Sequence, residues 1–439
     1  MSTAFEQGLF EVQSVMAAGA VVITALWLLL HRLGRSRPEL RIGRAVAAGV
    51  TLRVVAAAAL SEVAPGARGT DETTFLERAR SLLDSPLTGS ESIQAFTSEF
   101  HVWLFALQLR IPDFPEFAMR LLQVGISVAG LLLLLAAVYD LAGGRAAGIA
   151  AWLTMLEPSS IFFSSFLHKE PFMLFGAGLV AFGGARLWHR RDPHALLLMA
   201  AGGSVATVAR PYAGAMLFVA IAAIGLHGSI AKRGPMQRRS LVTGALILVV
   251  LLAGTPAALN QTSDERLLSR LQTVHDINAS DESNLKLGRV DFSTRTNIIL
   301  NLPKRMVDVA FRPFPWELGS TNQRLGLPGT LVALAVMLLL IRELLTPRGL
   351  FGRAGPVLYP AVFLFLAFSL SSGNAGTAFR LRSTVVSLAI AAIVVLRIKR
   401  AQQRAAELEV TTEPAQLADS PRPPRPTPAS IGSTSTAGG

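Results

Sequence analysis

The chain contains no cysteine and few charged residues, and these two shortages exclude several classes of protein. Without cysteine there is neither a disulfide framework nor a thiolate metal site, so the outer loops must be held by packing alone. Charged residues make up 16% of the chain and hydrophobic residues 51%, whereas a soluble domain carries about 25% charged residues. The excess apolar surface must face something other than water, which excludes an ordinary soluble protein.

Three patterns are also missing. There is no HExxH motif or adjacent histidine pair, which removes the usual zinc signatures. No repeat of fixed period is seen, which disfavours a transporter built from repeated halves. No basic segment precedes the first apolar run, because Glu6 and Glu11 come before it and the arginines follow. This run therefore indicates an uncleaved anchor and not a signal peptide.

Apolar residues are arranged in blocks of the length that crosses a bilayer, roughly 17 to 25 residues per helix. The sequence predicts an all-α, polytopic transmembrane helical bundle of about eleven spans, with interfacial helices in its outer loops. The expected spans are residues 12–30, 45–60, 121–138, 146–166, 171–188, 195–208, 212–226, 241–258, 330–341, 357–370 and 383–396.

Charge predicts the orientation of these spans. Lys and Arg collect after the first, fifth, seventh, ninth and eleventh spans, while the loops from Glu62 to Glu116 and from Asn260 to Leu327 carry the acids. Because basic residues resist translocation, we expect an outer N-terminus and a cytoplasmic C-terminus. The same distribution explains the net charge of +12 through orientation and anionic lipid headgroups, so no nucleic acid partner is expected.

The predicted organisation is a transmembrane domain over residues 1–400, with outer loops at 61–120 and 259–328. Residues 401–439 become polar and then rich in Pro, Ser, Thr and Gly, which predicts a disordered cytoplasmic tail. The half of the second outer loop that contains Trp316 is amphipathic. We expect it to lie in the outer interface, with Trp316 as an anchor.

The first outer loop contains two adjacent acids, Asp71 and Glu72, where a short amphipathic helix is expected to begin. Its apolar side would carry Phe75, Leu76, Ala79, Leu82 and Leu83. Adjacent helical residues point about 100° apart, so one acid can face the protein while the other faces water. The two interpretations are helix capping and a general base at the outer membrane face.

Cations stand at two outward helix starts. His168 and Lys169 precede Pro171, and Arg210 precedes Pro211, which makes each start a candidate anion site suited to phosphate. Arg380 and Arg382 lie at a similar depth, but they project about 200° apart, so at most one should face a given cavity. The alternative for each of these cations is snorkelling to lipid headgroups.

Two charges fall near the middle of predicted spans, where an unpaired charge costs at least ~2.5 kcal/mol. They are Arg53 in the second span and Glu157 in the fourth. We expect them to form a structural pair within the membrane.

The order of these features resembles the GT-C superfamily of polytopic glycosyltransferases, in its family-39-like and bacterial polysaccharide-assembly branch. The resemblance covers most of the chain up to Arg400. It rests on the Asp71-Glu72 pair, the run from RLLQVGISVAG at Arg120 to HKEPF at Phe172, RPY at Arg210, FRPFPWEL at Phe311 and GNAGTAFRLR at Gly373.

The resemblance implies a GT-C-like fold in a bacterial plasma membrane, and transfer of a sugar from a polyprenyl-phosphate-linked donor to a lipid, glycan or protein acceptor on the outer face. Asp71 would deprotonate the acceptor, with Glu72 as a supporting or metal-assisting acid. Lys169, Arg210 and one of Arg380 or Arg382 would hold the lipid phosphate. His168 would lie beside them, with Glu170 and Tyr212 in support.

Two alternative functions stay open. A polysaccharide polymerase could use the same outer arginines on lipid-linked repeat units, and a lipid or glycan flippase would need no base. No cofactor is identified, but a divalent cation could be held by the carboxylates of Asp71, Glu72 and Glu170, which are hard oxygen ligands.

Overall fold

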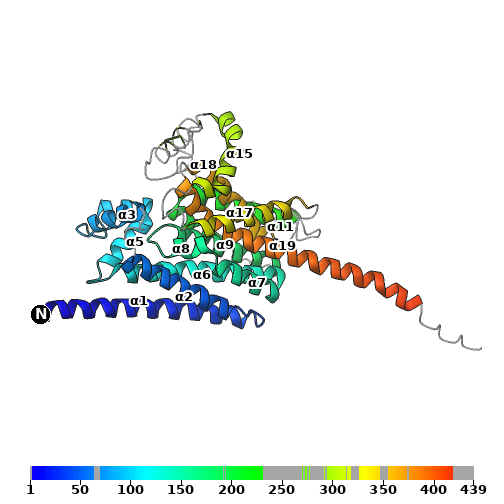
Figure 1. Ribbon diagram of the computed structural model, residues 1–439, viewed down its shortest axis with the longest axis horizontal. Helices are drawn as coiled ribbons and strands as arrows, with labels where there is room; N and C mark the ends of the chain where they lie inside the picture. Colours follow the sequence, from blue (N-terminus) through cyan, green and yellow to red (C-terminus); the bar gives the residue numbers. More distant parts are fainter. Residues whose placement is uncertain are drawn as a thin grey trace, which may run out of the picture. The chain divides into compact units, whose positions relative to one another are not determined.

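The computed structural model describes residues 2–63, 70–190, 192, 194–230, 269, 272–273, 276, 291, 294–312, 314–317, 326–346, 354–372 and 375–418. These residues form helices and contain no β-strand, as predicted. The chain divides into two compact units, Met1–Ile398 and Lys399–Gly439. The first unit contains the bundle of packed helices in Figure 1.

Helices lie at every predicted span inside the described residues, and the predicted span at 241–258 lies outside them. Seven helices of the described part are long and apolar enough to cross a membrane. They are α1 (Ser2–Arg35), α2 (Gly43–Ala58), α6 (Glu116–Ala142), α9 (Glu170–Arg190), α11 (Pro211–Ile230), α17 (Leu327–Leu344) and α19 (Ala375–Ala418). The protein is therefore an integral, multi-pass membrane protein with a helical bundle.

The predicted fourth span is broken. Residues 146–166 form α7 (Gly144–Met155) and α8 (Pro158–Ser164), which are bent by 62°. Pro158 opens α8, and the Glu157 carboxylate accepts hydrogen bonds from the backbone N–H groups of Ser159 and Ser160. Proline disfavours helix at the preceding residue and the acid caps the new helix, so one helix ends and another begins. The predicted sixth and tenth spans are shorter apolar helices, α10 (Ala195–Ala209) and α18 (Gly355–Ser371).

Arg53 and Glu157 are both buried at this break, but they do not form the direct ion pair that the sequence predicts. Arg53 Nη1 donates to the carbonyl oxygens of Met155 (2.7 Å) and Gly49 (3.0 Å), and its Nη2 donates to the Ser160 hydroxyl (2.8 Å). The break frees carbonyls at the end of α7 and amides at the start of α8. The Arg53 guanidinium binds the carbonyl at the end of α7, and the Glu157 carboxylate binds the amides at the start of α8. Ser160 forms a hydrogen bond with both side chains.

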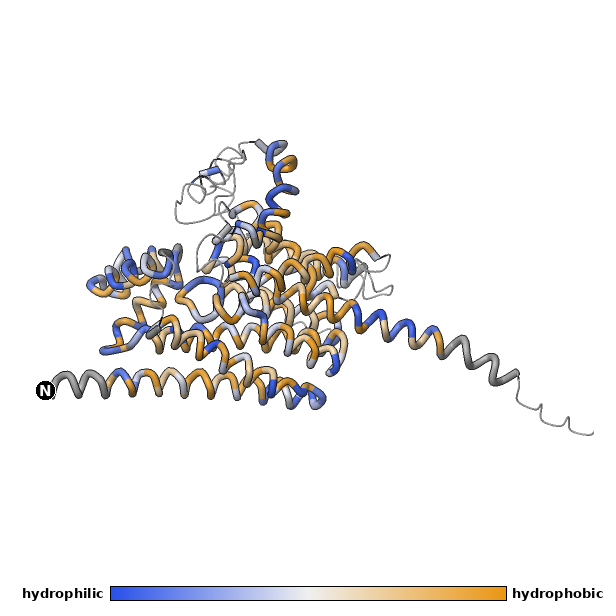
Figure 2. The backbone as a smooth tube through the Cα atoms, viewed as in Figure 1, coloured by the Kyte–Doolittle hydropathy of each residue, from blue (hydrophilic) through white to orange (hydrophobic). Residues whose placement is uncertain are grey.

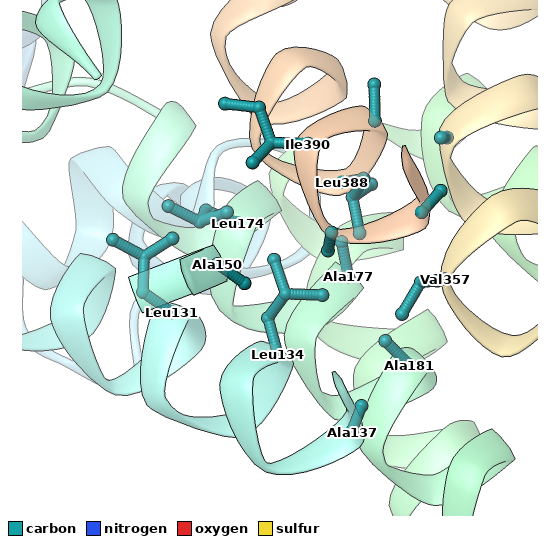
Figure 3. Packing of buried hydrophobic residues seen from close by; sticks show 14 of the residues in the cluster. Leu131, Leu134, Ala137, Ala150, Leu174, Ala177, Ala181, Val357, Leu388 and Ile390 are labelled. Carbon is teal, nitrogen blue, oxygen red and sulfur yellow. The ribbon is translucent and has the colours of Figure 1, made fainter. Parts of the chain in front are cut away.

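Helices α6 and α9 pack at short range because glycine removes the intervening side chains. A Cβ atom at Gly178 would lie 2.3 Å from the Gly130 carbonyl oxygen. Small residues at such crossings let membrane helices pack backbone to backbone. Around this contact, leucine, isoleucine and alanine fill the core shown in Figure 3, which labels Leu131, Leu134, Ala177, Leu388 and Ile390 among others.

The loop predicted as the first outer one forms α3 (Thr70–Ser81), α4 (Ser90–Ser98) and α5 (Phe100–Leu109). Leu76 and Ala79 of α3 belong to a separate buried cluster with Val102 and Phe105 of α5 and with Leu167. Figure 2 shows α3 as largely hydrophilic beside the apolar bundle. The expected amphipathic helix is present, and its apolar side holds it to α5. Leu83, which the sequence also predicted on that side, lies beyond the end of α3 and is exposed.

The loop predicted as the second outer one contributes α15 (Arg295–Phe311) and a short 3₁₀ helix, η3 (Pro315–Glu317). The Trp316 side chain is 79% exposed and stacks on Phe314 with ring centres 4.8 Å apart. Exposed Ile299 and Leu300 lie on α15. These residues are the ones expected in the outer membrane interface.

The predicted start of the tail differs from the structure. Disorder was expected from residue 401, whereas α19 continues to Ala418. The segment that follows Arg400 begins AQQRAAEL, which consists of strong helix formers and extends the helix at little cost. Residues 419–439 of the predicted tail lie outside the described residues.

Candidate active site

Asp71 lies in the first turn of α3 and forms an ion pair with Arg380 of α19. The Asp71 side chain is 49% exposed, whereas that of Arg380 is 13% exposed. Burial by itself would raise the pKa of Asp71, but the charge and the hydrogen bond of Arg380 outweigh it and hold the pKa below its ordinary value. Asp71 is therefore an ionised carboxylate that solvent or a second substrate can reach.

Glu170 connects Arg380 to Arg210. Its Oε1 accepts from Arg210 Nη2 at 2.6 Å and lies 3.0 Å from Arg380 Nε. Arg210 Nη1 also donates to the Tyr212 hydroxyl at 3.3 Å. The result is a continuous chain of opposite charges, Asp71 to Arg380 to Glu170 to Arg210, that joins α3, α19, α9 and the start of α11.

Helix starts explain how this chain of charges is assembled. Glu170 is the first residue of α9, and Arg210 directly precedes Pro211, which opens α11. The residue before a proline avoids the helical conformation, and Arg210 is extended with φ −150° and ψ 97°. This geometry ends α10 and directs Arg210 across to α9, where the first backbone N–H groups lack helical partners.

Lys169 and His168 lie beside this chain of charges. Lys169 Nζ is 5.4 Å from the centre of the Phe75 ring of α3. Burial, followed by the charge of Arg210, lowers the pKa of Lys169 to about 8, so Lys169 is mostly a cation at neutral pH. Burial and the charge of Arg380 lower the pKa of His168 to about 3. His168 is therefore uncharged at neutral pH and can offer only a neutral hydrogen bond.

Glu72 points away from Asp71. Its carboxylate is fully buried and forms an ion pair with Arg120 of α6. The rotation of about 100° between adjacent helical residues produces this divergence. Arg120 was not predicted as a site residue, although a charged residue in the first turns of an apolar span indicates a buried partner of opposite charge.

Arg382 lies away from Arg380, as their spacing predicts. Its Nη1 donates to the carbonyl oxygens of Ala310 (2.8 Å) and Arg312 (3.1 Å), and its guanidinium lies over the Phe379 ring. Arg382 thus caps the C-terminal end of α15, where free carbonyls carry partial negative charge. Of the two arginines, Arg380 is the one in the site.

His101 of α5 is a second residue that the sequence analysis missed. It is buried edge-on to Phe75, with ring centres 4.5 Å apart. Burial and the positive charge of Lys169 lower the pKa of His101 to about 2, and neither ring nitrogen has a hydrogen-bond partner among the described residues. No sequence pattern distinguishes this histidine from one in an ordinary core.

The three proposed oxygen ligands for a divalent cation do not fit one metal site. Asp71 is paired with Arg380, Glu170 with both Arg210 and Arg380, and Glu72 with Arg120. In the described part of the chain, no three acidic or histidine side chains gather as a metal site would require. Arginines occupy the positions between these acids.

The fold and the site define a multi-pass helical membrane protein with a chain of paired carboxylates and guanidiniums at one set of helix starts. No family model matches the chain, and neither does any protein of curated function. Among solved structures, it is similar to the crystal structure of ArnT from Cupriavidus metallidurans bound to undecaprenyl phosphate. The TM-score is 0.44 and the identity 15%, over 81% of this chain and 59% of that one. A likeness at this level assigns neither family nor activity.

Proposed function

We propose that the chain is a GT-C-like membrane glycosyltransferase that moves a sugar from a polyprenyl-phosphate-linked donor to a hydroxyl of a lipid, glycan or protein acceptor on the non-cytoplasmic face. The observation that carries this proposal is the chain of charges from Asp71 to Arg210. It combines a reachable carboxylate with buried cations, which are the two kinds of group that the reaction needs.

The charge of the cluster suits a phosphate. Lys169, Arg210 and Arg380 supply three positive charges, and Asp71 and Glu170 supply two negative charges, which leaves an excess of one positive charge. Arg210 Nε is buried and has no hydrogen-bond partner in the described part of the chain. A phosphate oxygen could accept a hydrogen bond from this Nε, because arginine forms strong charge-assisted hydrogen bonds to phosphate.

In the proposed reaction, the acceptor oxygen forms a bond to the anomeric carbon of the sugar. The bond from that carbon to the phosphate oxygen breaks, and its electron pair leaves on the lipid phosphate. Asp71 takes the acceptor proton, while Arg210, Arg380 and Lys169 stabilise the charge that develops on the phosphate.

The pair between Asp71 and Arg380 also suggests how donor binding would activate the base. An ionised Asp71 can accept a proton, but the Arg380 charge weakens it as a base. A donor phosphate that draws Arg380 away would raise the pKa of Asp71 toward its ordinary value. The base would then be strongest when a donor is present.

The test is incubation of the purified protein with a panel of polyprenyl-phosphate sugars and acceptors, with release of polyprenyl phosphate as the readout. We expect turnover with at least one donor. Arg210→Ala should abolish it, and Arg342→Gln, at an exposed position of α17, should not. No turnover by well-folded protein with any donor would refute the proposal.

A further inference from the structure

The buried ion pair between Glu72 and Arg120 connects two parts of the candidate site. Both side chains are 0% exposed. Arg120 Nη2 contacts Glu72 Oε1, and Arg120 Nη1 lies 3.3 Å from Glu72 Oε2. A two-pronged contact of this kind fixes the relative orientation of its partners. The ion pair therefore ties α3 to the first turns of α6.

The same two side chains also hold the segment that precedes Lys169. Arg120 Nη1 donates to the Ser165 carbonyl oxygen at 3.0 Å, and the Leu167 N–H donates to Glu72 Oε2 at 3.5 Å. Leu167 is two residues before Lys169, and Asp71 is next to Glu72 in the chain. One ion pair thus lies between the candidate base and the first of the candidate phosphate-binding cations.

We propose that Glu72 and Arg120 are positioning residues, whose ion pair sets the separation between Asp71 of α3 and the Lys169-Glu170 segment at the start of α9. The catalytic meaning of this role rests on the proposed function. The role differs from the base or metal ligand that the sequence suggested for Glu72, because a fully buried carboxylate cannot touch substrate.

The protonation of Lys169 reports this separation without any substrate. Lys169 lies between its own segment and the Phe75 ring of α3, and its pKa is lowered to about 8 chiefly because it is buried there. If the Glu72 charge is lost, a buried Arg120 has no counter-charge and the two segments separate. Lys169 then gains water, and its pKa moves back toward the ordinary 10.5.

The experiment measures the rate at which an amine-reactive reagent modifies Lys169 in the full-length protein in detergent, as a function of pH. Mass spectrometry of the Lys169 peptide gives the midpoint. The variant is Glu72→Gln. The matched control is Asp140→Asn, because Asp140 forms another buried ion pair of α6, with Arg37 at 2.9 and 2.5 Å.

We expect the Lys169 midpoint to rise from about 8 toward 10.5 in Glu72→Gln and to stay near 8 in Asp140→Asn. An unchanged midpoint in folded Glu72→Gln, or an equal rise in both variants, would overturn the positioning role. If Glu72→Gln does not fold, Glu72→Asp keeps the charge on a shorter side chain. A wild-type midpoint in that variant would also overturn the proposal.

This measurement is independent of the proposed function because it needs no sugar donor. Absence of turnover would leave a shifted midpoint and the positioning role intact. In an active enzyme, an unchanged midpoint would remove the positioning role alone.

Discussion

Asp71 and Arg380 form an ion pair although 309 residues separate them in the chain. The pair joins α3 to α19, the last membrane-spanning helix of the described part. Through Glu170 it extends to Arg210, so residues of α3, α19 and α9 meet the residue that precedes α11.

Replacing the candidate base should slow chemistry without weakening donor binding. For Asp71→Asn we expect kcat to fall by about 10² to 10⁴, the usual contribution of a general base. KM for the donor should not rise, because the change frees Arg380 from its ion pair. Initial rates measured across donor concentrations test this. The control is Glu77→Gln, because Glu77 is an exposed acid on the same helix. Full activity in Asp71→Asn together with no activity in Arg210→Ala would favour arginine-led polymerisation or transport.

The dependence of lipid phosphate binding on pH should follow Lys169. Its pKa of about 8 means that it loses its charge as the pH rises through that value, so affinity for polyprenyl phosphate should fall above about pH 8. For folding the sign is opposite. The unfolded chain holds this proton up to about pH 10.4. Because the unfolded state then binds more protons than the folded state, the free energy of unfolding increases as the pH rises from about 8 to about 10.4.

Affinity measured by fluorescence titration from pH 6 to 10 checks the prediction for Lys169. In Lys169→Arg, the side chain stays charged over the whole range, and the decline near pH 8 should disappear. A decline that persists in Lys169→Arg would assign the titration to another group.

Glu170 forms ion pairs with Arg210 and Arg380, which are cations that the donor phosphate would need. Glu170→Gln removes the competing charge, so affinity for polyprenyl phosphate should increase at least about fivefold, or about 1 kcal/mol. The same change leaves the buried Arg210 without its counter-charge, while Arg380 keeps Asp71, and a buried charge that loses its partner costs about 3–5 kcal/mol of stability. Thermal unfolding with and without the lipid measures both effects. Weaker lipid binding would instead mean that Glu170 organises the cations.

The approach of α6 to α9 should not tolerate a larger residue at its centre. In Gly178→Ala the new methyl group would lie 2.3 Å from the Gly130 carbonyl oxygen, and overpacking of this kind costs about 1–3 kcal/mol. We expect a lower Tm. The control is Gly148→Ala on α7, where an added Cβ has nothing within 4 Å. Equal Tm values for the two variants would contradict the packing described.

The sequence predicted much of the bundle because span length and hydropathy depend on local composition. It also predicted that Arg380 and Arg382 diverge, because that result depends only on helical rotation. The break at Pro158 was missed because the residues on both sides of it are largely apolar, and the length of the whole run suggested one span.

Partners far apart in the chain could not be predicted in the same way. Nothing near Glu72 in the sequence indicates Arg120, and nothing near Arg53 indicates that carbonyl groups would replace Glu157 as its partner. Such contacts depend on how helices pack, and several arrangements share one hydropathy pattern. The protonation of His168 could not be predicted either, because burial decides it and burial is not visible in a local motif.

The most direct test of the site is an electron cryomicroscopy structure of the full-length protein with polyprenyl phosphate, using a bound antibody fragment to add mass. We predict a phosphate within hydrogen-bond distance of Arg210, Arg380 and Lys169, with Glu170 displaced from Arg210. A phosphate bound elsewhere, with the contact between Arg210 and Glu170 still at about its present 2.6 Å, would contradict the account.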